Sequence, residues 1–277
     1  MTAASPELQA PPQACDTHIH VYDPRYPLAP TAAGPAPERA GFAEYRAVQR
    51  RLGLERAVIV QPTAYGFDNR ATLEGIAMLG PERTRGIAVV DDDVADDAMQ
   101  ALHAGGIRGV RFQMLPGGAL PWERADRVAA RAREAGWHVQ LQLDGRTLPD
   151  RLPQIRSWAG PIVIDHVGKF LEPVPLDHPG FRCLADLVAT GRVWVKLSAP
   201  YEVSKTGAPA YEDVGRIARE LVRLAPERML WASNWPHPGA KSRPDEAALL
   251  DLLLDWAPDE AVRRRILVDN PAEVYGF

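Results

Sequence analysis

The chain has 277 residues, 46% of them hydrophobic, and a formal net charge of −4. This length suits one large domain with a single core, and the balance of charges excludes the basic surface that a nucleic-acid-binding protein needs. No apolar run approaches the roughly 20 residues of a membrane-spanning helix. The two cysteines, Cys15 and Cys183, suit a reducing compartment and allow at most one disulfide.

These limits predict a cytoplasmic protein with no nucleic-acid or membrane partner, and they leave the oligomeric state open. Residues 1–13 have neither the basic start nor the apolar centre of a signal peptide. We therefore expect a flexible N-terminal tail over residues 1–13 and one domain over residues 14–277.

Eight short apolar runs recur along this domain, and most of them are rich in valine, isoleucine and leucine. The runs cover residues 14–20, 57–61, 86–90, 109–114, 138–143, 162–166, 193–198 and 229–234. Helical segments lie between them: apolar residues fall on one face over 121–135 and 211–224, and 245–256 is rich in leucine. Strands that are buried on both faces and alternate with helices predict a parallel sheet.

Eight such units in a chain of this length predict an α/β fold with a single (β/α)8 TIM barrel. An open doubly wound sheet is the structural alternative, and it is disfavoured because no glycine-rich phosphate-binding turn follows the first run. Residues 22–44 are rich in proline, glycine and alanine, and we expect a long loop there that covers the mouth of the barrel.

In a TIM barrel the active site lies at the carboxyl ends of the strands, and polar residues gather at these ends here. The first run contains Asp16, His18 and His20, and a period of two places all three on one side of the strand, opposite Cys15. We therefore do not expect a catalytic thiol. The eighth run ends at Asn234, and the prolines after it forbid further strand or helix. This residue is informative because an amide neither removes a proton nor binds a metal well.

The other carboxyl ends supply further polar and charged side chains. As substrate-binding candidates we assign Gln61, Arg111, Gln142, Lys169, Lys196, Tyr201 and His237. Arg111 and Lys196 have an alternative role as ion-pair partners inside the barrel wall. Three histidines have simpler explanations: His103 lies in a helical segment and is expected at the surface, His138 opens a strand at the opposite rim and is expected to be structural, and His178 is a loop residue.

Three segments carry a resemblance to a known family. They are Asp16-Thr17-His18-Ile19-His20, Ile164-Asp165-His166-Val167-Gly168-Lys169 and Ser233-Asn234-Trp235-Pro236-His237-Pro238. In this order they resemble the amidohydrolase superfamily of TIM-barrel, metal-dependent-hydrolase-like enzymes, and more narrowly the branch that holds D-galactarolactone isomerase and 2-pyrone-4,6-dicarboxylate lactonase. The resemblance implies a lactone isomerase or lactonase that acts on the carbonyl of a carboxylated lactone.

The departures from the family pattern bear on metal binding. A typical metal-binding member has a strand-five histidine and a strand-eight aspartate, where this chain has Gln142 and Asn234. His18, His20 and His166 remain, and a single zinc on these three histidines is the less favoured alternative. Because the branch that the chain resembles works without metal, we expect no metal and no other cofactor.

For catalysis we assign His18, His20, His166 and Asn234. Imidazoles on strands one and six can donate hydrogen bonds to a lactone carbonyl, and a neutral histidine can move a proton. Asn234 cannot deprotonate water, but an isomerase needs no water because its nucleophile is a hydroxyl of the substrate. We expect isomerisation of a sugar-acid 1,5-lactone to the 1,4-lactone, with metal-free or single-zinc lactone hydrolysis as the alternative. A non-catalytic protein that binds carbohydrate acids is the third hypothesis.

Overall fold

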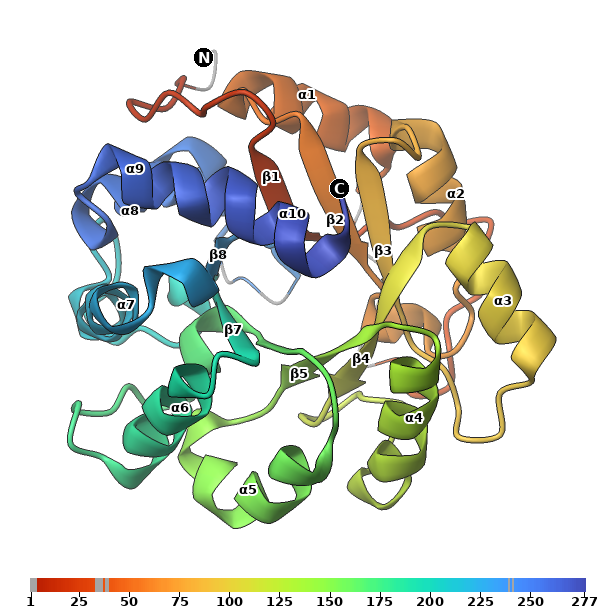
Figure 1. Cartoon of the computed structure of the whole chain (residues 1–277). Coiled ribbons are helices and arrows are strands. Elements are labelled where there is room, and N and C mark those ends of the chain that lie inside the picture. Colours follow the sequence, from red (N-terminus) through yellow and green to blue (C-terminus); the bar gives the residue numbers. More distant parts are fainter. Residues whose placement is uncertain (1–3, 33–36, 38–39, 239, 241) are drawn as a thin grey trace.

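Eight parallel strands form one sheet whose order follows the chain from β1 to β8, with helices around it (Figure 1). The computed structural model describes residues 4–32, 37, 40–238, 240 and 242–277. The strands are β1 (Cys15–Ile19), β2 (Arg56–Val60), β3 (Thr84–Ala88), β4 (Ile107–Gln113), β5 (His138–Gln142), β6 (Ile162–Ile164), β7 (Val193–Leu197) and β8 (Met229–Trp231). The predicted (β/α)8 barrel is confirmed, and each of the eight apolar runs overlaps one strand.

The barrel closes between β1 and β8 through side-chain and loop hydrogen bonds. The hydroxyl of Thr17 donates to the carbonyl oxygen of Trp231 at 2.8 Å. Beyond the end of β8, the backbone N–H of Asn234 donates to the carbonyl oxygen of His18 at 3.0 Å. This bond fixes the segment after β8 against the end of β1, so Asn234 lies close to the histidines of the first strand.

Helices connect the strands and cover the outside of the sheet (Figure 1). Among the described residues they are α1 (Phe42–Leu52), α2 (Arg70–Leu79), α3 (Asp96–Ala104), α4 (Trp122–Glu134), α5 (Leu148–Ser157), α6 (Pro179–Ala189), α7 (Glu212–Leu224), α8 (Glu246–Trp256), α9 (Glu260–Arg264) and α10 (Asn270–Tyr275). The helices predicted at 121–135, 211–224 and 245–256 are confirmed as α4, α7 and α8. Apolar spacing explains them: in α4, Ala125, Val128 and Ala132 share one buried face.

The amino-terminal end of the barrel is filled by apolar side chains. One buried cluster there contains Val58, Val60, Ile87, Val163 and Leu230, together with Cys15 of β1 and Tyr275 of α10. Helices α9 and α10 cross this end of the barrel (Figure 1). The ring of Tyr275 packs edge-on against that of His138, with 5.2 Å between the centroids, so His138 has a structural place in the core. The cavity described below lies at the opposite, carboxyl end.

A bulge in β1 changes the direction of its side chains. Three steps along β1, from Asp16 to Ile19, match two steps along β2. The carboxylate of Asp16 therefore points out of the barrel, where it accepts a hydrogen bond from the hydroxyl of Tyr45 in α1 at 3.3 Å. Cys15 lies in the barrel interior, and burial raises the pKa of its thiol well above the usual value. The prediction that Asp16 shares one side of the strand with the two histidines after it is wrong, because the bulge separates them.

The described part of the N-terminal segment, residues 4–13, packs onto the barrel. Leu8 is only 4% exposed. The carboxylate of Asp251 in α8 accepts hydrogen bonds from the backbone N–H groups of Glu7 at 3.1 Å and Leu8 at 2.8 Å. These contacts hold Glu7 and Leu8 against α8, and residues 1–3 of the predicted tail lie outside the described residues.

The long loop predicted after the first strand ends where α1 begins at Phe42. Two of its residues, Tyr22 and Pro37, line the cavity at the carboxyl end of the barrel. Residues 33–36 and 38–39 of this loop lie outside the described residues, and so does the part of the prediction that falls on them. Over the described ranges, no helix is both long enough and apolar enough to cross a membrane.

Candidate active site

A cavity of about 480 Å³ opens at the carboxyl end of the barrel. Six residues assigned from the sequence line it: His20, Arg111, Gln142, His166, Lys169 and Asn234. Further polar groups in its lining come from Tyr22, Gln113 and Glu202. This volume and this set of convergent polar groups suit a small polar ligand.

The tautomers of His18 and His20 follow from their hydrogen-bond partners. Nδ1 of His20 lies 2.7 Å from the carbonyl oxygen of Val60, which can only accept, so this Nδ1 carries the proton. The bare Nε2 of His20 then accepts from the Nε2–H of His18 at 3.2 Å. Nδ1 of His18 is then the acceptor for the ammonium group of Lys196 at 3.3 Å, and Oδ1 of Asp165 lies at the same distance from it. Burial lowers the pKa of both rings, that of His20 to about 3, so both are neutral at pH 7.

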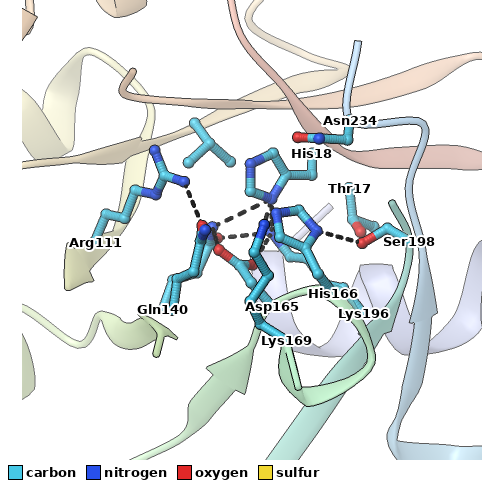
Figure 2. Close-up of polar contacts among 12 residues, drawn as sticks. Thr17, His18, Arg111, Gln140, Asp165, His166, Lys169, Lys196, Ser198 and Asn234 are labelled. Carbon is cyan, nitrogen blue, oxygen red and sulfur yellow. Dashed lines mark hydrogen bonds and ion pairs between the residues drawn. The ribbon is translucent and has the colours of Figure 1, made fainter. Parts of the chain in front are cut away.

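A layer of buried polar groups adjoins these histidines (Figure 2). Nζ of Lys196 donates to Oε1 of Gln140 at 2.7 Å and lies 3.3 Å from Nδ1 of His18. The same ammonium group is 3.6 Å from Oδ1 of Asp165. Burial lowers the pKa of Lys196 to about 8, which leaves the group charged at pH 7. Burial acts to raise the pKa of Asp165, but nearby positive charges, that of Lys196 foremost, hold it below its usual value.

One group of side chains among the described residues has the spacing of a metal site. Ligand atoms of His18, Asp165 and His166 all lie within 4.8 Å of one another. The ammonium group of Lys196 faces two of these residues, and the bare nitrogen of His18 is turned toward it. A divalent ion would have to bind beside this positive charge, so the donor set fits an internal ion pair better than a metal site. His20, which the zinc alternative requires, is not part of the group.

His166 reaches the cavity from the short turn η3 (His166–Gly168), which follows β6 directly. His166, Val167 and Lys169 have φ angles of 53°, 55° and 48°, in the left-handed region that is unfavourable for these residue types. Such backbone costs on the order of 1–3 kcal/mol per residue and is concentrated at functional sites. The sequence therefore maintains an unfavourable turn that presents His166 and Lys169 to the cavity.

The ring of His166 can carry its proton on either nitrogen. Its Nδ1 lies 2.8 Å from Oγ of Ser198, at the end of β7 (Figure 2). A hydroxyl group both donates and accepts, so Ser198 satisfies Nδ1 in both tautomers. Burial lowers the pKa of His166 well below its usual value, which keeps the ring neutral. A neutral ring with two supported tautomers is suited to moving a proton.

The amide of Asn234 has a fixed orientation. Its Nδ2 donates to Oε1 of Glu202 at 2.8 Å and to the hydroxyl of Tyr201 at 2.9 Å. Because a carboxylate only accepts, the NH2 group must be the one that faces Glu202. Oδ1 of Asn234 is buried and has no hydrogen-bond partner among the described residues. Asn234 lines the cavity, and this buried oxygen is the hydrogen-bonding group of its amide that the described residues leave unused.

The guanidinium group of Arg111 is buried in the cavity wall without an ion-pair partner among the described residues. One terminal nitrogen donates to the carbonyl oxygen of Gln61 at 2.9 Å, and the other donates to Oε1 of Gln142 at 2.8 Å. Its Nε has no partner within the described part of the chain. A buried cation that contacts only neutral groups is suited to binding the carboxylate of a ligand.

Lys169 and Glu202 form an ion pair in the same wall, with side chains 8% and 15% exposed. Glu202 is the last residue of the turn η4 (Pro200–Glu202), which follows β7. Burial lowers the pKa of Lys169 to about 8, so its ammonium group is charged at pH 7. The cavity thus contains a carboxylate, although the residue at the end of β8 is an amide.

A chain of hydrogen bonds leads from Asn234 away from the cavity. The hydroxyl of Tyr201 lies 2.9 Å from Nδ1 of His237, and Nε2 of His237 lies 3.3 Å from Oε1 of Glu246. Burial acts to raise the pKa of Glu246, but its hydrogen bonds with His237 and Arg243 lower it to about 2. Tyr201 and His237, both assigned from the sequence to substrate binding, therefore contact Asn234 and its support instead of lining the cavity.

Two other substrate-binding candidates also have protein partners. Gln61 donates through Nε2 to the carbonyl oxygens of Gly66 and Asp68, and its Oε1 accepts from the hydroxyl of Thr72 at 2.6 Å. These bonds hold the turn after β2. Lys196 belongs to the buried polar layer. Neither side chain is in the lining of the cavity, so both are placed to support its walls.

The histidines that the sequence analysis set aside lie far from the cavity or have local partners. His103 in α3 is exposed, and its Nδ1 accepts from the indole N–H of Trp137 at 3.0 Å. Nδ1 of His178 accepts from the backbone N–H of Gly180 at 3.0 Å and caps α6.

The sequence analysis missed Gln140, Asp165 and Glu202 as members of the site. Gln140 lies two residues before Gln142 on one strand, so the period of two was a signal for it. Asp165 directly precedes His166. Glu202 had no such signal, because it lies in a turn and its partner Asn234 is 32 positions away in the chain.

Comparisons with known proteins agree with this geometry. A family model described as amidohydrolase matches residues 15–277. D-galactarolactone isomerase of Agrobacterium fabrum is 37% identical, over 99% of this chain and 95% of the relative. The 2-pyrone-4,6-dicarboxylate hydrolase of Comamonas testosteroni is 33% identical, over 98% of this chain and 93% of the relative. A crystal structure of Agrobacterium tumefaciens ATU3138 without ligand has a TM-score of 0.94 at 36% identity and covers 99% of this chain and 98% of that chain. The resemblance inferred from the three sequence segments is confirmed.

Proposed function

Because this chain belongs to the amidohydrolase family, we propose that it isomerises a carboxylated sugar-acid lactone from the 1,5-form to the 1,4-form without a bound metal ion. Its similarity to D-galactarolactone isomerase along nearly the whole of both chains supports this class of reaction. The observation that carries the proposal is the free Oδ1 of Asn234, an acceptor that is too weak a base to deprotonate water.

The nucleophile of the proposed reaction is a hydroxyl group of the substrate. Oδ1 of Asn234 accepts a hydrogen bond from this hydroxyl and directs its oxygen at the lactone carbonyl. Attack forms the new carbon–oxygen bond, and collapse of the tetrahedral adduct breaks the bond to the former ring oxygen. His166 takes the proton from the attacking hydroxyl and gives it to the departing oxygen, so neither water nor a net proton is consumed. Positioning of this kind supplies effective molarities of roughly 10⁵–10⁸ M.

The charges of the cavity wall suit a carboxylated substrate. The fork of Arg111 binds the substrate carboxylate, because this guanidinium pairs with no carboxylate in the described part of the chain. The ammonium group of Lys169 is available to polarise the lactone carbonyl as negative charge develops on its oxygen. The monolactone of an aldaric acid has one free carboxylate, because its other carboxyl group forms the lactone, so the one unpaired buried cation of the described wall, Arg111, matches it.

Lactone hydrolysis is the second candidate function. The carboxylate of Glu202 in the cavity favours it, and so does the similarity to the 2-pyrone-4,6-dicarboxylate hydrolase. As a base for water, however, Glu202 is hindered by its ion pair with Lys169 and its hydrogen bond with Asn234. A single-zinc hydrolase on His18, His20 and His166 is the metal-dependent version of this candidate.

One time course separates these candidates. A panel of aldaric-acid and pyrone lactones is followed by NMR in ¹⁸O-labelled water, and the ¹⁸O content of the products is then measured by mass spectrometry. Isomerisation leaves solvent oxygen out of the product, whereas hydrolysis incorporates it. Incorporation in every product would overturn the isomerase proposal, and ligand binding without turnover would favour a binding protein. Metal analysis of the purified protein, with activity before and after chelation, tests the zinc version.

A further inference from the structure

Glu202 connects two polar groups of the cavity wall. Oε1 of Glu202 accepts from Nδ2 of Asn234 at 2.8 Å, and its other oxygen pairs with Nζ of Lys169. All three side chains line the cavity, and they come from the segments after β7, β8 and β6. One carboxylate thus fixes the positions of an amide and an ammonium group that belong to separate segments of the chain.

Glu202 is the charged partner that selects the orientation of the Asn234 amide. The two ends of an amide have nearly the same shape, so the choice between them depends on hydrogen-bond partners. The hydroxyl of Tyr201, the other partner of Nδ2, favours the same end, because its proton goes to Nδ1 of His237 and its oxygen is left to accept. A carboxylate tolerates only the NH2 end. With the amide turned over, two acceptor oxygens would face each other and the NH2 group would point into the cavity.

We propose that Glu202 is a positioning residue that holds Asn234 with its carbonyl oxygen in the cavity, where it accepts the hydrogen bond of the attacking substrate hydroxyl. This inference rests on the proposed isomerase function. It gives the turn after β7 a role in catalysis that is separate from the roles of the histidines and of the segment after β8. The ion pair with Lys169 serves the same end, because it holds the carboxylate of Glu202 in place.

The first test is Glu202→Gln, which keeps the shape and removes the charge. A glutamine at this position offers Asn234 either a donor or an acceptor, so position 202 no longer selects the orientation of the amide, and the uncharged Tyr201 is left to hold it. We expect kcat to fall roughly 10²-fold, at the lower end of what assisted proton transfer contributes. KM should not rise in parallel, because Lys169 loses its partner and remains available to the substrate. The matched control is Glu172→Gln, which breaks the exposed ion pair between Glu172 and Lys205 and should leave both constants unchanged.

The second test exchanges the two functional groups. In Glu202→Gln/Asn234→Asp, the new amide at position 202 donates to the new carboxylate at position 234, which again presents an acceptor oxygen to the cavity. The rate of isomerised product alone should rise at least about tenfold above the single Glu202→Gln variant, in the range that general acid–base groups contribute. A purely structural role for Glu202 predicts that the double variant is no better than the single one.

Failure of this inference is distinguishable from failure of the proposed function. Wild-type protein that turns over no lactone would refute the function, and the amide is then read directly from NOEs between the side-chain NH2 protons of Asn234 and the ring of Tyr201. Loss of these NOEs in Glu202→Gln supports the positioning role, and their persistence overturns it. Wild-type protein that isomerises a lactone, with an unchanged kcat in a folded Glu202→Gln variant, overturns the positioning role alone. Should that variant not fold, Glu202→Asp, which keeps a shorter carboxylate, must show the NOEs and a smaller loss of kcat.

Discussion

Replacing Asn234 by aspartate puts a second carboxyl group against Glu202. The amide nitrogen that this change replaces lies 2.8 Å from Oε1 of Glu202. Two negative charges at this separation repel each other by about 6 kcal/mol at an effective dielectric constant of about 20. That energy corresponds to roughly 4 pKa units, and the neighbouring Lys169 offsets part of it. The pair should therefore share one proton at neutral pH and lose it near about pH 7 to 8.

The product ratio of Asn234→Asp should therefore depend on pH. Below about pH 7, the shared proton leaves the variant without a free base, and isomerisation should dominate as in the wild type. As pH rises through the second ionisation, the carboxylate at position 234 becomes able to deprotonate water. We expect the ratio of hydrolysed to isomerised product to increase at least about tenfold between pH 6 and pH 9, within the range that a general base contributes.

The assay is ¹⁸O incorporation, measured at both pH values after subtraction of the enzyme-free rate. The wild type provides the baseline, with an amide at 234 that does not titrate. A ratio of hydrolysed to isomerised product that stays constant across this pH range in Asn234→Asp would refute the reasoning, because the carboxylate would then be present without deprotonating water. Hydrolysis that is already dominant at pH 6 would refute the shared proton.

Three further predictions follow from the same geometry. Arg111→Lys keeps the charge and loses the fork, so KM should rise roughly 10- to 100-fold with little change in kcat; steady-state kinetics check this, and an equal loss in kcat would place Arg111 in the chemical step. His166→Ala should lower kcat by roughly 10²–10⁴-fold, with the fold followed by circular dichroism, and wild-type turnover would remove His166 from the site. Glu246→Gln should lower the free energy of unfolding by roughly 2 kcal/mol at pH 7, after allowance for solvent screening. Since the pKa of Glu246 is lowered to about 2, this stabilisation is present above pH 4.5 and lost as pH falls toward 2, so urea titrations of variant and wild type should converge toward pH 3.

The barrel could be predicted from the sequence because its strands are buried on both faces. Uninterrupted apolar runs then mark the strands, and their number and spacing define the fold. The predicted ends of the strands were less accurate where hydrogen bonds from side chains replace the backbone hydrogen bonds between strands. β8 ends at Trp231, three residues before the end of the predicted run, because the next residues bond to β1: the N–H and hydroxyl of Ser233 donate to the carboxylate of Asp16. A pattern of apolar residues contains no information on such bonds.

The residues of the site also differ in how well the sequence predicts their positions. His20, Arg111 and His166 lie at the carboxyl ends of strands. These ends meet at one rim of every TIM barrel, so the fold alone brings the three residues together. The direction of Asp16 could not be predicted, since one inserted residue in β1 reverses it. Glu202 could not be predicted either, because its position depends on a turn whose shape is set by contacts distant in the sequence.

The amide at position 234 has an electrostatic consequence beyond its weak basicity. Among the described residues of the cavity wall, Lys169 and Glu202 neutralise each other, and Arg111 is left with its positive charge. With an amide at the end of β8, the wall therefore keeps one net positive charge for an anionic lactone. An aspartate there would repel Glu202 at close range, and it would cancel this charge once the proton that the two carboxyl groups share is lost. The amide of Asn234, which cannot deprotonate water, thus also strengthens the attraction for a carboxylated substrate. Substrate binding and the choice of nucleophile are therefore coupled through one side chain.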